Sequence, residues 1–184
     1  MKRLIPAVLL LMMGTVAGAQ KITLSTNILE WMELGTMNVE ASVAAARHIS
    51  VGAGVKWNPW TYKAGDPETQ AQNRQLVLNA GMRYGPWHIF SGWWMGAKGQ
   101  YATYNIGGIW SRETEEGDAF GLGFGGGYTL LLTSALNLDF GIGAWTGTRT
   151  WIRYSCPRCG QVLENGSGLF VLPNELLVSL VYVF

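Results

Sequence analysis

Residues 119–132 read AFGLGFGGGYTLLL, and bulky apolar side chains alternate there with glycine. The bulky residues on one side are Phe120, Leu122, Phe124, Tyr128 and Leu130. Alternation with period two predicts a β-strand, because successive side chains of a strand point to opposite faces. Glycine opposite bulky apolar residues fits the wall of a barrel with a narrow interior and an exterior that faces lipid.

The same alternation recurs along the chain, and no segment shows a convincing helical period. We expect eight strands, at about residues 22–29, 38–47, 49–60, 75–84, 88–104, 119–131, 136–154 and 170–184. After the first twenty residues no apolar stretch reaches the length of a membrane-spanning helix, which excludes a helical membrane protein.

The connections between the expected strands alternate between short and long. The second and third, fourth and fifth, and sixth and seventh strands are joined tightly, whereas the connections that follow each pair are long and polar. All tight turns then lie at one end, as in outer-membrane barrels with short periplasmic turns and longer outside loops. The sequence therefore predicts an all-β fold, an eight-stranded antiparallel transmembrane β-barrel with periplasmic termini.

The N-terminal segment, MKRLIPAVLLLMMGTVAGAQ, has the pattern of a secretory signal peptide. Lys2 and Arg3 precede a short apolar run, and Ala17-Gly18-Ala19 forms an A-x-A-like cleavage site. The apolar run is too short to span a membrane. We expect a cleaved signal peptide over residues 1–19 and a single barrel domain over residues 20–184.

Charged residues make up only 14% of the chain, and the net charge is +1, so no nucleic-acid partner is expected. Six charges still fall within the expected strands, opposite the large apolar side chains: Glu40, Lys56, Arg83, Lys98, Asp139 and Glu175. A cation facing lipid would cost about 2–4 kcal/mol at the bilayer midplane. We therefore expect these charges to pair inside a lumen that side chains fill.

Aromatic residues make up 12% of the chain and gather near the ends of the expected strands. The outer rim is expected to carry Trp31, Trp57, Trp60, Tyr101, Tyr104, Phe120, Trp151, Tyr154 and Phe170. The inner rim is expected to carry Tyr84, Trp87, Tyr128, Tyr182 and Phe184. Amphipathic rings prefer the level of lipid headgroups, so the sequence predicts two aromatic girdles.

The last strand, LLVSLVYVF, places large apolar residues at every second position up to a terminal aromatic residue. These residues are Leu176, Val178, Leu180, Tyr182 and Phe184. The pattern resembles the C-terminal signal that the barrel-assembly machinery binds. A one-sided apolar strand suits binding by edge addition, in which the backbone supplies affinity and alternate side chains supply specificity.

Cys156 and Cys159, in YSCPRCG, are the only cysteines. An even cysteine count in an exported chain favours a disulfide, which would pin an outside loop locally. The spacing also suits half of a zinc site or a redox pair, but zinc needs four ligands. His48 and His88, the only histidines, are expected at the opposite rim. The disulfide is favoured, an intermolecular metal site and reactive thiols stay open, and no cofactor is expected.

Several segments together resemble one family: KITLSTNILEW, HISVGAGVKWNPW, GAKGQYATYNIGGIW, GLGFGGGYTL, and YSCPRCG followed by the terminal strand. The mature chain is similar throughout to uncharacterised outer-membrane β-barrels of Bacteroidota, a domain family of unknown function (DUF3575). The resemblance implies an eight-stranded barrel of the OmpA/OmpX type. Some members of the family lie beside fimbrial gene clusters, and no activity is established for it.

The sequence thus predicts a structural or adhesive outer-membrane protein that acts through its outside loops, since binding residues are often placed on loops of a rigid scaffold. One expected loop carries a mostly acidic cluster, namely Arg112, Glu113, Glu115, Glu116 and Asp118. The expected partners are the lipid bilayer, lipopolysaccharide, the barrel-assembly machinery and a surface or fimbrial protein.

Three alternatives stay open. The first is a narrow channel. The second is a lipid-modifying enzyme, which would need a base such as His48 or His88 beside its nucleophile. We expect no enzyme, because both histidines fall at expected periplasmic turns. The third is a soluble secreted β-barrel that binds apolar ligands in its core, for which the glycine-rich face would have to point outward.

Overall fold

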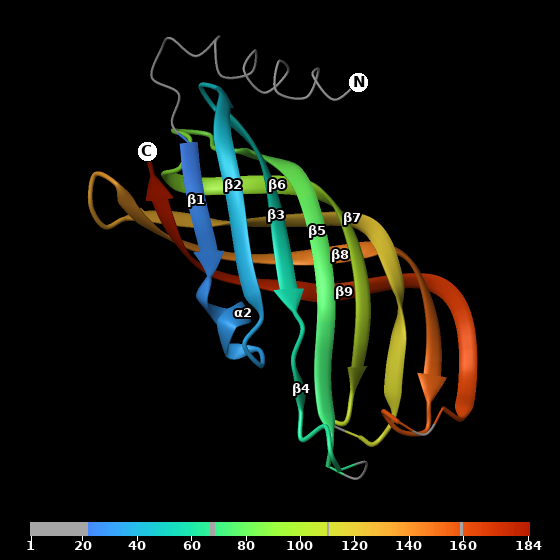
Figure 1. Cartoon of the computed structure of the whole chain (residues 1–184). Helices are drawn as coiled ribbons and strands as arrows, with labels where there is room; N and C mark the ends of the chain where they lie inside the picture. The colour runs from blue at the N-terminus through green and yellow to red at the C-terminus, as the bar shows by residue number, and fades with distance from the viewer. Residues whose placement is uncertain (1–21, 67–68, 110, 159) are drawn as a thin grey trace, which may run out of the picture.

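The computed structural model describes residues 22–66, 69–109, 111–158 and 160–184 (Figure 1). The signal peptide expected over residues 1–19 lies outside these ranges. No helix within the described ranges is long and apolar enough to cross a membrane.

Eight long strands form a closed antiparallel barrel, which confirms the predicted all-β fold and its strand count (Figure 1). They are β1 (Ile22–Asn27), β2 (Met37–Ala46), β3 (Ile49–Asn58), β5 (Ala71–Tyr84), β6 (Gly92–Gly107), β7 (Thr114–Leu131), β8 (Leu136–Tyr154) and β9 (Val162–Val183). Two shorter elements are the helix α2 (Ile28–Met32) and the strand β4 (Thr61–Tyr62). Each long strand pairs with the next along the chain, and β9 pairs with β1 to close the barrel.

The barrel wall is uneven, because β5 to β9 continue well beyond the ends of β1 to β3 (Figure 1). One row of paired residues runs from Asn58 through Gln75, Tyr104, Gly117 and Trp151 to Gly166. From this row to the loops, the five strands form a sheet that we call the projecting sheet, residues 71–75, 104–107, 114–117, 151–154 and 162–166. Much of it was expected to be loop.

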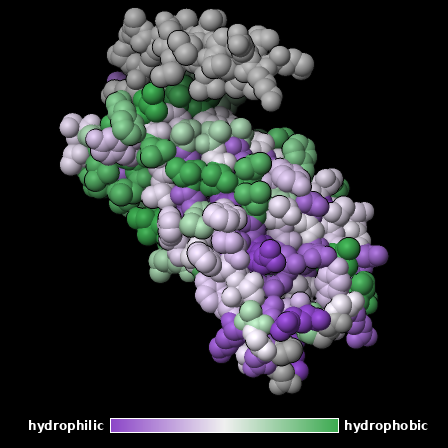
Figure 2. Space-filling model, viewed as in Figure 1, coloured by the Kyte–Doolittle hydropathy of each residue, from purple (hydrophilic) through white to green (hydrophobic). Residues whose placement is uncertain are grey.

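Outward side chains between the two ends of the barrel are apolar and exposed, and we call them the apolar band. Examples from all eight long strands are Leu24, Val39, Val51, Leu78, Trp93, Phe120, Phe124, Phe140, Ile142, Leu176 and Tyr182. Figure 2 shows hydrophobic surface gathered over the end near the chain termini and hydrophilic surface over the projecting end. The alternation therefore turns its large apolar side chains outward and its small and polar ones into the lumen.

Glycines line part of the lumen because an aromatic ring lies directly against them. Trp94 points inward from β6, and a Cβ atom added at Gly127 would come within 2.7 Å of the Trp94 ring and 1.9 Å of the Phe140 carbonyl oxygen. A Cβ atom at Gly141 would lie 2.8 Å from the same ring. The glycines that the sequence places on one face therefore leave room in the lumen for the Trp94 ring.

Toward the projecting sheet, the lumen is filled by an apolar cluster of Val77, Ala102, Ala119, Trp145 and Phe170. The Trp145 and Phe170 rings pack edge to face with their centroids 4.6 Å apart. Side chains from β5, β6, β7, β8 and β9 meet in this cluster, so it closes the barrel on that side.

Three aromatic residues predicted for the outer girdle point inward instead. Phe170 is buried in the apolar cluster, and Tyr104 packs against that cluster. The Trp151 ring lies over Gly166, where an added Cβ atom would come within 2.7 Å of it. For Phe170 the prediction was wrong because β9 has a bulge: it advances three residues from Glu175 to Leu172 while β8 advances two from Gly143 to Trp145, which reverses the facing of β9. Tyr104 and Trp151 follow the unbroken alternation of their own strands, on the lumen face with Lys98 and Asp139, so their height along the barrel alone did not give their facing.

Candidate functional site

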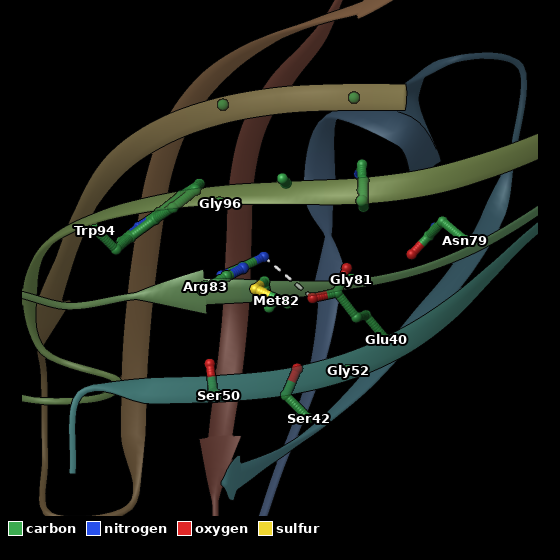
Figure 3. A pocket seen from close by; sticks show the side chains of 14 residues that line it. Glu40, Ser42, Ser50, Gly52, Asn79, Gly81, Met82, Arg83, Trp94 and Gly96 are labelled. Carbon is green, nitrogen blue, oxygen red and sulfur yellow. Dashed lines mark hydrogen bonds and ion pairs between the residues drawn. The ribbon is translucent and has the colours of Figure 1, made fainter. Parts of the chain in front are cut away.

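The charged centre of the lumen is Arg83 of β5, and Figure 3 shows its contact with Glu40 of β2. Its Nη1 atom donates a hydrogen bond to Oδ2 of Asp139 at 2.8 Å. Its Nη2 atom donates to Oε1 of Glu40 at 3.1 Å. The guanidinium also lies over the Trp94 ring, 4.5 Å from the ring centroid. One arginine therefore connects β2, β5, β6 and β8 across the barrel.

Three of the six expected lumen charges thus meet in one cluster. The Asp139 side chain is almost fully buried, with 5% exposed, whereas Arg83 and Glu40 retain 27% and 25%. Removing two carboxylates and a guanidinium from bulk water is unfavourable, and paired hydrogen bonds compensate for it. The loss of any one of the three side chains would therefore leave a partly buried charge unpaired and destabilise the barrel.

Lys56 does not join this cluster, and it pairs with Glu30 of α2 instead. Asn27 caps α2 by accepting a hydrogen bond from the Leu29 amide at 3.2 Å, and its Nδ2 atom donates to Oε1 of Glu30 at 3.1 Å. Sequence reasoning missed Glu30 because it assigned Leu29 and its neighbours to a strand. The signal was present, since Asn27-x-x-Glu30 has the spacing of a helix-capping box.

The remaining two expected lumen charges are Lys98 and Glu175, and the structure describes only the side chain of Lys98. Lys98 lines the same internal cavities as Arg83 and Glu40. Its side chain passes over Gly123, where an added Cβ atom would lie 3.2 Å from Lys98 Cγ. The side chain of Glu175 lies outside the described part of the structure.

Three small cavities surround Arg83 and Glu40, with volumes of about 40, 20 and 30 Å³. Figure 3 shows the largest, with polar side chains from β2, β3, β5 and β6 around it. Each can hold one or a few water molecules and is far too small for an organic ligand. Oδ1 of Asp139 and Nε1 of Trp94 are buried and have no protein partner, so water would satisfy them. No metal-binding cluster of His, Cys, Asp or Glu occurs among the described residues.

A second charged cluster stiffens the projecting sheet on its inner face. The Glu115 carboxylate accepts hydrogen bonds from Arg149, Arg153 and Tyr104, each at 3.1 Å. The Arg149 guanidinium stacks over the Trp151 ring, 4.8 Å from its centroid. Above the apolar band, burial and the nearby Glu115 carboxylate raise the pKa of Tyr104 to about 12, so this phenol remains a hydrogen-bond donor.

The expected acidic loop is therefore largely a strand. Glu115, Glu116 and Asp118 belong to β7 and alternate between its faces. Glu116 faces outward and accepts hydrogen bonds from Asn105 at 2.9 Å and from the Tyr154 hydroxyl at 2.6 Å. Asp118 also faces outward and accepts from the Tyr101 hydroxyl at 2.8 Å. The prediction failed because a polar strand lacks the apolar alternation that identifies a strand from sequence.

Both histidines lie at the end opposite the projecting sheet. A ring nitrogen of His48 shares a hydrogen bond with the Gly85 carbonyl oxygen at 3.0 Å, which links two inner turns. His88 forms an isolated bridge with Ser91 and lines the innermost of the small cavities.

Cys156 is buried and disulfide-bonded. The only other cysteine of the sequence, Cys159, lies outside the described residues. Beside it, Arg158 donates a hydrogen bond to the Ala64 carbonyl oxygen at 2.9 Å. This turn therefore contacts the connection between β4 and β5.

The residues of the expected assembly signal share the outward face of β9, where Leu176, Val178, Leu180, Tyr182 and Phe184 alternate with inward residues. The Tyr182 and Phe184 rings pack edge to face at 4.8 Å. The Phe184 amide donates to the Ile22 carbonyl oxygen at 2.8 Å, next to the closure of the barrel. Recognition of this strand by the assembly machinery stays a prediction.

Comparison with known proteins identifies the family. No curated protein and no solved structure matches this chain. A model of one protein family, described as "Protein of unknown function (DUF3575)", matches residues 5–184. The match covers all eight strands of the barrel, the lumen cluster and the projecting sheet. This eight-stranded barrel therefore belongs to the DUF3575 family.

Proposed function

We propose that this protein is a small outer-membrane β-barrel with a closed lumen, which presents its projecting sheet and outer loops at the cell surface in a structural or adhesive role. The observation that carries the proposal is the apolar band around the whole barrel. Between the inner turns and Asp118, the outward carboxylate that borders the projecting sheet, its described outward side chains are uncharged, and several are highly exposed, such as Ile142 at 70% and Phe120 at 62%. Soluble monomers rarely expose contiguous apolar patches above a few hundred Å².

The lengths of the connections at the two ends support an orientation of the barrel with the tight turns in the periplasm and the long loops outside. The tight turns lie beside the chain termini, and the loops beyond the projecting sheet are longer and polar, as in barrels with periplasmic turns and outside loops. The disulfide of Cys156 agrees with an oxidising compartment. In this orientation the outward strand that ends at Phe184 serves as the signal for the assembly machinery.

The filled lumen favours a scaffold over a channel. The apolar cluster around Trp145 and Phe170 closes the side near the projecting sheet. The cavities around Arg83 each hold only about 20 to 40 Å³. A conducting pore would need these side chains to move apart. Single-protein conductance in planar bilayers tests this point, and we expect no stable open level.

A non-enzymatic role is also part of the proposal. His48 bonds to the backbone of a neighbouring turn, and His88 lies at the same inner end, away from the lipid-facing outer wall. The projecting sheet instead offers a rigid platform, since the Glu115 cluster ties β6, β7 and β8 together. A surface or fimbrial protein is the kind of partner that such a platform would serve.

The first test is the location and orientation of the barrel. Washed outer membranes should contain a protein whose gel mobility in SDS changes on boiling. An epitope inserted after Gly65, which has open space around it, should be reached by antibody on intact cells. The same epitope inserted after Ser134, in the turn between β7 and β8, should be reached only after permeabilisation. A soluble periplasmic protein without a heat shift would refute the proposal, and labelling at Ser134 alone would reverse the orientation.

A further inference from the structure

One edge of the projecting sheet, formed by β9, has no neighbouring strand (Figure 1). β9 pairs with β8 along nearly its whole length, but its ladder with β1 ends at the pair of Asn27 with Ser179. The Asn27 side chain covers one further step, because its Nδ2 atom donates to the Leu176 carbonyl oxygen at 3.1 Å and its Oδ1 atom accepts from the Val178 amide at 3.2 Å. Among the described residues, no strand pairs with the other side of residues 165–172, which we call the open edge.

The open edge presents backbone donors and acceptors in a regular row. The Phe170 carbonyl oxygen points toward β8, where it accepts a hydrogen bond from the Thr146 hydroxyl at 3.0 Å. Backbone groups of successive residues in a strand point to opposite sides, so those of the residues on either side of Phe170 point away from β8. Four residues thus direct an amide and a carbonyl group to the open edge: Asn165, Ser167, Leu169 and Val171. Another extended backbone matches this spacing of donors and acceptors.

The open edge lacks the features that usually protect such strands. Natural proteins cover their sheet edges, or place charges and prolines on them. Residues 165–172, NGSGLFVL, contain neither a charge nor a proline. Leu169 and Val171 are 85% and 73% exposed. The opposite edge of the projecting sheet is covered, because β4 pairs with the outer end of β5. The fold therefore protects one edge of this sheet and leaves the other available.

The side chains beside the open edge differ between its two faces. Leu169 and Val171 lie on the outward face, since they pair with the outward residues of β8. On the inner face, the Trp151 ring lies over Gly166 and Gly168, within 2.7 Å and 3.5 Å of an added Cβ atom. A strand added to this edge would place apolar side chains beside Leu169 and Val171, and would meet the Trp151 ring on its other face. The matching occupant is an extended segment with apolar residues at alternate positions.

The open edge lies above the membrane in the proposed orientation. The fifteen residues from Leu169 to Phe184 span about 50 Å of strand, at about 3.3 Å per residue. With a strand tilt of about 35–45°, this length rises about 35–40 Å along the membrane normal, whereas the apolar band of such barrels is about 25 Å tall. The free backbone groups are therefore in water and within reach of other proteins at the cell surface.

A second copy of this barrel in the same membrane does not fit the open edge. A two-fold axis along the membrane normal gives both β9 strands the same tilt, so two facing strands would cross at about 70–90°. Paired strands are rotated by only about 20–25° relative to each other. The occupant is therefore a different chain.

We propose that the open edge is a docking site for an extended peptide segment of another surface or secreted protein, which adds to β9 as a further strand. Backbone hydrogen bonds supply the affinity, and the contacts with Leu169, Val171 and Trp151 select apolar residues at alternate positions of the segment. The site rests on the proposed function, because that function places the edge at the cell surface.

Peptide binding to the full barrel in lipid nanodiscs tests the site. The probe is a short fluorescent peptide in which threonine and valine alternate between terminal lysines, and its binding is followed by fluorescence anisotropy. Two further peptides carry N-methyl groups, one on the valines and one on the threonines. Only one of these two sets of amides faces β9 in an added strand. We therefore expect one methylated peptide to bind at least about tenfold more weakly than the parent and the other to bind like the parent.

A pair of variants tests the same edge from the side of the barrel. Leu169→Pro removes an amide that β8 does not use, and we expect it to weaken peptide binding at least about tenfold. Leu169→Val keeps both the amide and an apolar side chain, so it is the matched control and should bind like the unmodified protein. If Leu169→Pro lacks the heat shift of a folded barrel, Ser167→Pro replaces it.

Hydrogen exchange adds a measurement on the unmodified protein. The amides of Leu169 and Val171 should exchange at least about tenfold faster than that of Phe170, which faces β8. The parent peptide should slow the exchange of Leu169 and Val171. Unchanged exchange at both positions with the peptide bound would place the peptide elsewhere on the barrel and overturn the proposal.

The docking site is also refuted if Leu169→Pro binds the peptide like Leu169→Val, or if the two methylated peptides bind equally. A dimer of the unmodified barrel in native mass spectrometry that Leu169→Pro separates would assign the edge to a second copy and refute the site as well. The proposed function survives each of these results, provided that the protein fractionates with the outer membrane and shifts on heating. A protein that does neither refutes the proposed function, and with it the surface location of the edge.

Discussion

The most informative single change is Arg83→Met, because Arg83 connects four strands inside the barrel. The variant removes the partner of Asp139 and Glu40 and leaves a similar apolar stem in place. Removing one partner of a buried ion pair destabilises a protein by about 3–5 kcal/mol. Arg83 and Glu40 remain roughly one quarter exposed, so water compensates in part, and we expect a loss near the lower end, about 3 kcal/mol.

The assay is equilibrium unfolding in urea of the barrel reconstituted in lipid vesicles, followed by tryptophan fluorescence and by the heat-shifted gel band. With a slope of about 2 kcal/mol per molar urea, the loss corresponds to a midpoint about 1.5 M lower. Arg47→Met, in an exposed turn at the inner rim, is the matched control and should stay within about 0.5 kcal/mol.

A second variant separates the charge from the packing. Replacing all three charges, by Arg83→Met with Glu40→Gln and Asp139→Asn, leaves no unpaired charge in the lumen. It should recover more than half of the lost stability, because a buried ion pair contributes little net stability compared with neutral replacements. If Arg83→Met unfolds like Arg47→Met, or if the triple variant is the least stable, the cluster does not hold the barrel together.

Three further predictions concern packing and the outer turn. Gly127→Ala should destabilise the barrel by about 1–3 kcal/mol, because the new methyl group would overlap the Phe140 carbonyl oxygen and the Trp94 ring. Its control in the same urea titration is Gly65→Ala, where nothing lies within 4 Å, and equal urea midpoints for the two variants would contradict this expectation. Trp145→Ala should cost about 3–5 kcal/mol by emptying the apolar cluster, and in planar bilayers it should raise the frequency of brief openings; a silent, equally stable variant would show that other residues close the lumen. Cys156→Ser should lower unfolding stability by no more than about 2 kcal/mol, since the cross-linked loop is short, and the heat-shifted band should persist; loss of that band would give the turn a larger role.

The sequence was sufficient for the barrel because one physical rule governs most of it. Wherever a strand faces an apolar surrounding on one side, large apolar residues recur at every second position, as Phe120, Leu122 and Phe124 do. The alternation identifies the strand and its two faces together. Tight turns between such strands then fix the order of pairing, and the strand count follows.

The projecting sheet could not be found in the same way. Glu115, Glu116 and Asp118 are polar on both faces of β7, so the alternation is invisible there. Their strand conformation depends on partners such as Arg149 and Tyr154, which lie far away in sequence. The local alternation of one strand does not contain that information.

The inward tryptophans were missed for a related reason. Large aromatic residues were expected only on the outside, yet Trp94 and Trp145 occupy the lumen. Trp94 fits because Gly127 and Gly141 provide space on two neighbouring strands. The facing of one residue thus depends on small residues across the sheet, which becomes visible only when the register is known.

The closure between β1 and β9 has a consequence for how this barrel opens and forms. It joins Thr23–Asn27 to residues 179–183 only, whereas β7 and β8 are paired along the whole of both strands. The two ladders of β1, with four pairs to β2 and five to β9, are the shortest between long strands of the barrel. An unpaired backbone group in hydrocarbon costs several kcal/mol, so β1 is the least expensive strand to separate from the wall in the proposed membrane setting. We therefore expect β9 to stay paired with β8 during insertion, and β1 to complete the closure of the barrel last.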